Sequence, residues 1–248
     1  MNNQIKNHFT RSYMNQKQSN LTAMPIFFAF LCMGFGDAVG PLVGLAKETF
    51  DLSNFVAQMI AFSGFIMFGV LSIPLGVFQD KKGKKYILLL GLAIAFIGLL
   101  VPILNGMYGP KVKIDPESDL KFIMLLVSVL LLGAGATILQ VAGNPIMRDV
   151  SAPGKYSSNL SLGQSIKAIG SSIGFLVPPL ATAYFGLDWS ILFPIYAILI
   201  LGTFIWTRTT KIREVKEPES SPASFGSSLR LLGNGYVFFM VFGIFLYV

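Results

Sequence analysis

GVFQDKKGKK (residues 76–85) is a short basic segment at the junction of two long apolar runs, residues 57–79 and 86–106. A helix rises about 1.5 Å per residue, so each run is long enough to cross the roughly 30 Å apolar core of a bilayer. Two such runs joined by a tight lysine-rich turn predict a pair of membrane-spanning helices whose connection lies in water.

The rest of the chain repeats this alternation of apolar runs and polar turns. Of its 248 residues, 53% are hydrophobic and only 12% are charged, a balance outside the range of soluble domains. We therefore predict an all-α polytopic membrane protein. The expected spans are residues 23–46, 57–79, 86–106, 121–147, 159–185, 189–207 and 231–248.

Polar segments divide the chain into four parts. Residues 1–22 lack the apolar core of a signal peptide and are expected to form a cytoplasmic tail. Residues 23–207 hold six spans, and the Ser- and Pro-rich residues 208–230 are typical of a cytoplasmic linker between two membrane halves. The last run, residues 231–248, stops without a polar anchor, so we expect the start of a truncated C-terminal bundle. A complete seven-span protein is the alternative.

The basic residues predict the orientation of the chain. The net charge is +7, and with the N-terminus inside, 14 of the 19 Lys and Arg residues fall on the cytoplasmic side and 4 outside, while Lys167 lies within a span. This asymmetry predicts a multi-pass plasma-membrane protein with a cytoplasmic N-terminus. Because the basic residues occupy short loops, the charge does not indicate nucleic acid as a partner.

Residues that carry enzyme chemistry are scarce. His8, the single histidine, lies in the tail, and Cys32, the single cysteine, lies within a span. A metal site, a catalytic triad or a disulfide framework therefore lacks its parts. We expect no enzyme activity, no cofactor and no metal.

The opening segment also carries a recognisable pattern. Gly76, Asp80, Gly83, Lys84 and Lys85 match G-x-x-x-D-x-x-G-[RK]-[RK]. This resembles the signature loop of the major facilitator superfamily, at its expected place after the second span. The resemblance implies the six-helix N-terminal half of a transporter bundle, followed by the start of a seventh helix, and a conformational role for the loop.

Further stretches resemble one branch of that superfamily, the fucose permeases, which are sugar:proton symporters. They are GDAVGP (residues 36–41), FDLSNFVAQ (50–58), LQVAGNPIMRDV (139–150) and NLSLGQSIKAIGSSIG (159–174). The resemblance implies import of a hexose or deoxyhexose, such as glucose, galactose or fucose, by proton symport with alternating access, in a protein that is monomeric when full length. The recurrence of DAVGP (37–41) and QVAGNP (140–145) suggests two inverted three-helix repeats.

Individual residues carry over from this branch. Asp37 matches its protonatable aspartate in the first span, Asn144 matches the Asn-Pro pair that ends the fourth, and Gln164 matches a glutamine that faces the sugar. Two positions depart from the pattern. Gln140 stands where the fucose transporter has a glutamate, and Lys167 stands where it has an asparagine.

The residues themselves support a site in the same place. Asp37 and Lys167 are the two charges well inside the predicted spans, and charges at that depth normally face a bundle interior and find a partner. We predict that this pair forms and breaks as the coupling device. A static pair that fixes helix packing is the alternative. Contact between them requires tilt or side-chain reach, because Asp37 lies roughly 20 Å along its span and Lys167 about 12 Å along its own.

Amides are suited to sugars because they donate and accept hydrogen bonds, as hydroxyls do. We therefore assign substrate binding to Gln140, Asn144 and Gln164. Phe35, Phe62 and Phe65 are candidates for stacking on a sugar ring, and each is also a candidate for ordinary packing.

Small residues on the first and fifth spans predict close helix crossings. Gly36, Gly40 and Gly44 repeat at four-residue spacing, as do Gly170 and Gly174.

Other functions stay open at this point. A sodium-coupled symporter or a uniporter of a sugar is the runner-up, since Gln140 leaves one titratable carboxylate in place of two. A membrane receptor or scaffold is a remote alternative, because neither has an evident need for an intramembrane Asp and Lys.

Overall fold

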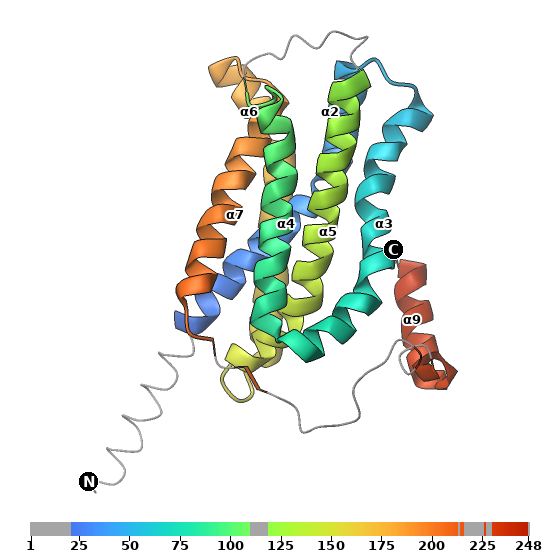
Figure 1. Cartoon of the computed structure of the whole chain (residues 1–248), viewed down its shortest axis with the longest axis vertical. Coiled ribbons are helices and arrows are strands. Elements are labelled where there is room, and N and C mark those ends of the chain that lie inside the picture. Colours follow the sequence, from blue (N-terminus) through green and yellow to red (C-terminus); the bar gives the residue numbers. More distant parts are fainter. Residues whose placement is uncertain (1–20, 110–118, 213, 216–225, 227–229, 248) are drawn as a thin grey trace, which may run out of the picture.

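The computed structural model describes residues 21–109, 119–212, 214–215, 226 and 230–247, and over these residues it is a helical bundle without strands (Figure 1). The chain is helical at residues 21–37 and continues as α2 (Val39–Thr49), α3 (Asn54–Lys82), α4 (Lys84–Leu104), α5 (Asp119–Val150), α6 (Tyr156–Phe185), the 3-10 turn η1 (Trp189–Ile191), α7 (Leu192–Thr209), the 3-10 turn η2 (Leu231–Gly233) and α9 (Gly235–Tyr247).

Six of these helices are long and apolar enough to cross a membrane, with residues 21–49 counting as one of them. The prediction of an all-α, multi-pass membrane protein is therefore confirmed. The seventh apolar run forms η2 and α9, and α9 stands outside the six-helix bundle in Figure 1.

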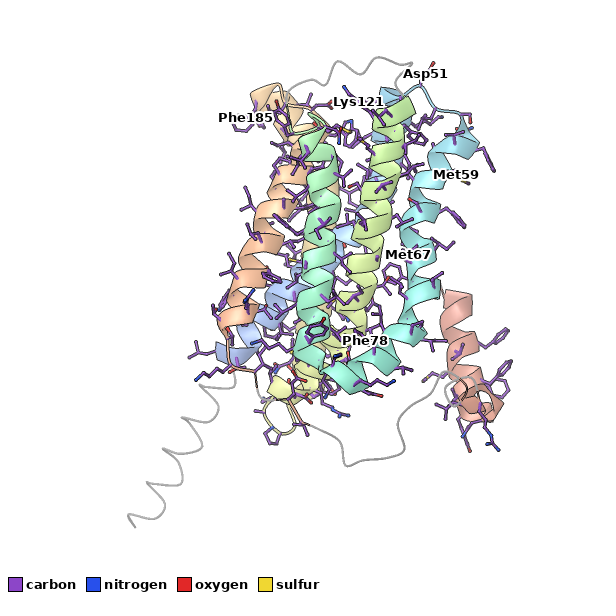
Figure 2. All side chains as sticks on the ribbon, viewed as in Figure 1. Asp51, Met59, Met67, Phe78, Lys121 and Phe185 are labelled. Carbon is purple, nitrogen blue, oxygen red and sulfur yellow. The ribbon has the colours of Figure 1, made fainter. Side chains whose placement is uncertain are left out.

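The bundle has two polar ends. Gly83 is the single residue between α3 and α4, and its φ of 93° is a conformation that side chains with a Cβ rarely adopt. We call this the α3–α4 end, and the opposite end, with the turn at residues 50–53, the α2–α3 end. In Figure 2, Phe78 lies at the α3–α4 end, whereas Asp51 and Lys121 lie at the other.

The first membrane span is broken near its middle. Residues 21–37 and α2 are separated by a turn at Ala38, directly after Asp37. Pro41 explains the break, because it has no N–H for the carbonyl of Asp37, four residues earlier, and its ring crowds that carbonyl. Interrupted helices of this kind are common at the binding sites of transporters.

Glycines let the helices approach closely. A Cβ on Gly34 would overlap the backbone carbonyl of Lys167, and one on Gly170 would overlap that of Leu31. Likewise, a Cβ on Gly133 of α5 would overlap the carbonyl of Gly64 on α3. These contacts fix α6 against the first span and α3 against α5 at backbone distance.

The predicted glycine repeat on the first span is only partly correct. A Cβ on Gly36 would lie 2.7 Å from Cβ of Ala136, whereas Gly40 and Gly44 have no atom within 4 Å of that position. On the fifth span, Gly170 and Gly174 do lie at a crossing, as expected. The repeat misleads because the turn at Ala38 redirects the helix beyond it.

The core lies between the first span and α4, α5 and α7, where the fully buried side chains include Phe30, Met33, Phe35, Leu88, Leu92, Leu99, Leu125 and Ile138. The apolar windows of α3 and α6 are the least buried, at 17% and 22%, against 44–61% in the other four. Both of these helices therefore present most of their side chains outward.

The α3–α5 crossing provides a test of this packing. Gly133→Val is expected to lower the stability of the detergent-purified protein by about 1–3 kcal/mol, because its side chain has no room against Gly64. Gly69→Val is the matched control, since nothing lies within 4 Å of its Cβ position. Equal melting temperatures for the two variants would contradict the described crossing.

Candidate functional site

The two intramembrane charges form an ion pair. Nζ of Lys167 lies 2.9 Å from Oδ2 of Asp37, and the Lys167 side chain is 18% exposed and that of Asp37 36%. The hydroxyl of Ser171, one turn beyond Lys167 on α6, lies 3.5 Å from the same oxygen. The contact that the sequence left conditional on tilt or reach is therefore present.

The glycine crossing explains how the pair forms. Gly34 lies against the backbone of Lys167. The backbone of Lys167 is therefore about one helical turn from the level of Asp37 on the first span. Its long side chain covers the remaining distance. Close approach of the two backbones thus positions both charges.

A second polar feature lies between α3 and α5. A cavity of about 370 Å³ is lined by Phe68, Ser72, Thr137, Gln140, Val141, Asn144 and Pro145. We call it the α3–α5 notch. It contains two of the three amides assigned to the substrate.

The notch is rich in free hydrogen-bond acceptors. Ser72 donates its hydroxyl to the carbonyl of Phe68, and Thr137 donates to that of Gly133, so each oxygen keeps lone pairs. Oδ1 of Asn144 is buried and has no hydrogen-bond partner among the described residues. A buried acceptor of this kind is stabilised when a ligand brings a donor to it.

The predicted site residues thus fall into two groups at similar depth. Two contacts align the first span with α5: Gly36 packs on Ala136, and Gly143 packs on Met33. Gln140 lies between these contacts on α5, so it is within about one turn of the level of Gly34. Gln164 is exposed on α6, one turn before Lys167. Among the described residues, no hydrogen bond joins the ion pair to the notch.

The candidate aromatic residues lie in different surroundings. Phe35 is buried and stacks on Tyr196 at a centroid distance of 3.9 Å, so it packs the first span against α7 and is not available to a ligand. Phe62 and Phe65 are exposed on α3. Phe65 lies near Phe68, which lines the notch.

A larger groove of about 590 Å³ extends from the level of the ion pair toward the α2–α3 end. On α2 its wall follows Pro41, Gly44 and Glu48, and on α6 it follows Gly174, Pro178 and Thr182. These positions continue the helix faces that carry Asp37 and Lys167. The groove therefore begins one turn beyond Asp37 on α2 and one turn beyond Ser171 on α6.

The signature loop is arranged around a carboxylate that sequence reasoning missed. Oε2 and Oε1 of Glu214 accept hydrogen bonds from the backbone N–H groups of Lys84 (2.7 Å) and Lys85 (3.0 Å). Glu214 therefore caps the N-terminus of α4, where the helix dipole favours an anion. A Cβ on Gly83 would lie 2.9 Å from the same carboxylate, which explains the glycine.

The lysines of the loop are also engaged. Nζ of Lys84 lies 2.6 Å from Oδ2 of Asp149, a side chain only 1% exposed at the end of α5. Nζ of Lys85 donates to the carbonyls of Arg208 and Thr210 at the C-terminal end of α7. Asp80 is exposed, and no ion pair joins it to another described residue, while Gly76 has open space around it.

Within the described part of the chain, no group of three or more His, Cys, Asp or Glu residues is arranged to hold a metal ion.

The architecture and the loop match a known family. The model of the Major Facilitator Superfamily matches residues 26–248. The chain belongs to this superfamily. Its fold resembles that of the facilitator FucP in the outward conformation, with a TM-score of 0.61 at 20% identity, over 86% of this chain and 55% of that one. The six helices thus correspond to the N-terminal half of a facilitator.

Curated facilitators of similar sequence come from several bacteria. The chain is 30% identical to a putative glucose/galactose transporter of Helicobacter pylori and 25% identical to a glucose/galactose transporter of Brucella abortus, over 64% of its length in each case. It is 25% identical to an L-fucose-proton symporter of Haemophilus influenzae over 60% of its length. The aligned parts cover 37%, 36% and 32% of those relatives, so the chain spans little more than a third of their length.

The pair at the signature loop generates a prediction. Lys84→Met is expected to lower the free energy of unfolding by about 3 kcal/mol, because it leaves the buried Asp149 carboxylate without its cation. Unfolding of the purified protein in mixed micelles measures this. Lys81→Met, at an exposed position of the same loop, is the control, and adding Asp149→Leu to Lys84→Met should restore part of the loss. Equal stability of the Lys81 and Lys84 variants would contradict a structural pair.

The Glu214 cap on α4 generates a second prediction. Glu214→Ala removes both acceptors and is expected to destabilise the first turn of α4 by about 1 kcal/mol. Hydrogen–deuterium exchange at residues 84–87 should become several-fold faster. Glu48→Ala, which removes an exposed glutamate elsewhere, should leave these amides unchanged. Unchanged exchange in the Glu214 variant would show that the carboxylate does not cap the helix.

Proposed function

We propose that the protein is a secondary transporter that imports a monosaccharide of hexose size together with a proton. The observation that carries this proposal is the Asp37–Lys167 ion pair, which joins the two charges that lie well inside the membrane spans. Ionisable residues at membrane depth are costly, and in transporters they mark the paths of ions and substrates.

The pair has two states, with Asp37 ionised or protonated, and they differ in the contact between Asp37 and Lys167. With Asp37 ionised, the contact to Lys167 closes the first span onto α6. With Asp37 protonated, the attraction is lost and the two helices are held by their glycine contact alone. Since alternating access requires helices to rearrange around a central site, this switch links proton binding to the conformational change.

The α3–α5 notch is the proposed place for the sugar hydroxyls. Gln140 supplies an amide that both donates and accepts, and Ser72 and Asn144 supply acceptors. Relatives named as glucose/galactose transporters and as L-fucose-proton symporters support a sugar of this size. The full transporter is expected to act as a monomer.

The proposed orientation places the α3–α4 end in the cytoplasm. The lysines of residues 81–85 lie at that end, together with Lys155, Arg208 and Lys211, and clustered Lys and Arg residues favour the cytoplasmic side. The groove between α2 and α6 then opens to the outside. A substrate and a proton would reach the pair from there.

Sodium coupling or uniport is the second candidate. It is favoured by Gln140, an uncharged residue in the wall where the fucose permease pattern has a second acid. Sodium would then replace the proton at Asp37, or the pair would stay closed throughout.

An uptake assay decides between these functions. The full-length protein in proteoliposomes is expected to take up at least one member of a panel of glucose, galactose, fucose and the corresponding uronates, and an inward proton gradient should accelerate that uptake. Asp37→Asn should abolish the acceleration, because the amide cannot take up a proton. Asp51→Asn is the control, since it neutralises an exposed carboxylate outside the pair, the groove and the notch. Acceleration by sodium alone would favour the second candidate, and uptake of no panel member would reject the proposed function.

A further inference from the structure

We infer that the substrate carries a negative charge, and that the site accepts a sugar acid, a polyhydroxylated monocarboxylate, in preference to a neutral sugar. The inference rests on the proposed function and names its substrate class. It follows from the charges that surround the proton-binding carboxylate.

The site holds one positive and one negative charge. Among the described residues, the charged partner of Lys167 is Asp37, with 2.9 Å between Nζ and Oδ2. The helices packed around the pair are α2, α5, α6 and α7, and their other charged side chains lie at the helix ends: Lys47, Glu48, Lys121, Arg148, Asp149 and Arg208. The nearby Tyr196 and Cys32 are buried and uncharged, one stacked on Phe35 and the other hydrogen-bonded to Thr203. The ionised pair is therefore neutral as a unit.

Proton uptake by Asp37 destroys this neutrality. The carboxylate becomes a neutral acid, and the Lys167 ammonium stays at membrane depth without the one charged partner that the described residues give it. An unpaired charge in such a place is costly. Sodium bound at Asp37 has the same consequence, because it also cancels the negative charge.

A substrate carboxylate removes the conflict. The proton moves from the outer solution to Asp37, Lys167 keeps its own proton, and the ammonium exchanges the Asp37 carboxylate for that of the substrate. On the inner side the substrate leaves, Asp37 releases its proton, and the original pair re-forms. Each cycle carries one proton and one negative charge, so it moves no net charge.

The remainder of the site is suited to a polyol. The α3–α5 notch lies at a depth similar to that of the pair and is lined by the hydroxyl-bearing Ser72 and the amides of Gln140 and Asn144, of which Oδ1 of Asn144 is buried in the wall. Sugar hydroxyls are donors and can satisfy these acceptors. One end of the substrate would thus be recognised by charge and the other by hydroxyl contacts.

A comparison of paired substrates tests this inference. In proteoliposomes containing the full-length protein, with an inward proton gradient, we expect the half-saturating concentration of glucuronate or galacturonate to be at least about 10-fold lower than that of glucose or galactose, as expected for a charge-assisted contact. Lys167→Asn should abolish this difference and Lys167→Arg should keep it. Lys155→Asn, which removes an exposed lysine just before α6, is the matched control and should change nothing.

The electrical behaviour supplies a second measurement that does not depend on a variant. Proton-coupled uptake of a monocarboxylate should be insensitive to an inside-negative potential set with potassium and valinomycin, whereas proton-coupled uptake of a neutral sugar should be accelerated. Preferential, potential-driven uptake of glucose or galactose would overturn the inference and leave the proposed function standing. A uronate preference that survives Lys167→Asn would also overturn it. Uptake of no sugar of either kind would reject both.

Discussion

A charged side chain at the depth of a bilayer core needs an opposite charge beside it, because the surroundings solvate neither charge well. Asp37 and Lys167 meet this requirement for each other across the first span and α6. Whatever binds to either residue must respect the same balance. The constraint therefore connects the packing of two helices to the ions and substrates that the site can take.

The backbone is shaped to bring the two charges together. Pro41 deprives the carbonyl of Asp37 of its helical partner and breaks the first span there, while Gly34 and Gly170 remove the side chains that would hold α6 away. The sequence therefore provides a weak point in one helix beside a close crossing with another. Such a junction can be rearranged at small cost, because few side chains have to be repacked.

Long-range periodicity made the fold predictable, and local chemistry made part of the site predictable. Six of the seven predicted spans correspond to helices of membrane length, because each run is apolar over most of its length. Asp37 and Lys167 stood out because charges inside such runs are rare. In contrast, Ser72 and Glu214 carry no signal of their own, since a serine in a helix and a glutamate in a polar segment are ordinary. Their roles arise from contacts with residues far along the chain, and such contacts leave no local pattern. The turn at Ala38 likewise changed which glycines face a neighbour, so the repeat at Gly36, Gly40 and Gly44 overstated the packing.

Two ion pairs among the described residues, Lys84–Asp149 and Asp37–Lys167, differ in how firmly they are held. Asp149 is 1% exposed, and its Oδ2 accepts from both Nζ of Lys84 and the backbone N–H of Val215, so it is held by two contacts at the α3–α4 end. Asp37 is 36% exposed and has, besides Lys167, only a 3.5 Å contact to Ser171. Both pairs satisfy the same requirement for neutrality. The second has fewer hydrogen bonds to hold it in place, which is why the proposed function assigns coupling to Asp37 and Lys167 and a structural role to Lys84 and Asp149.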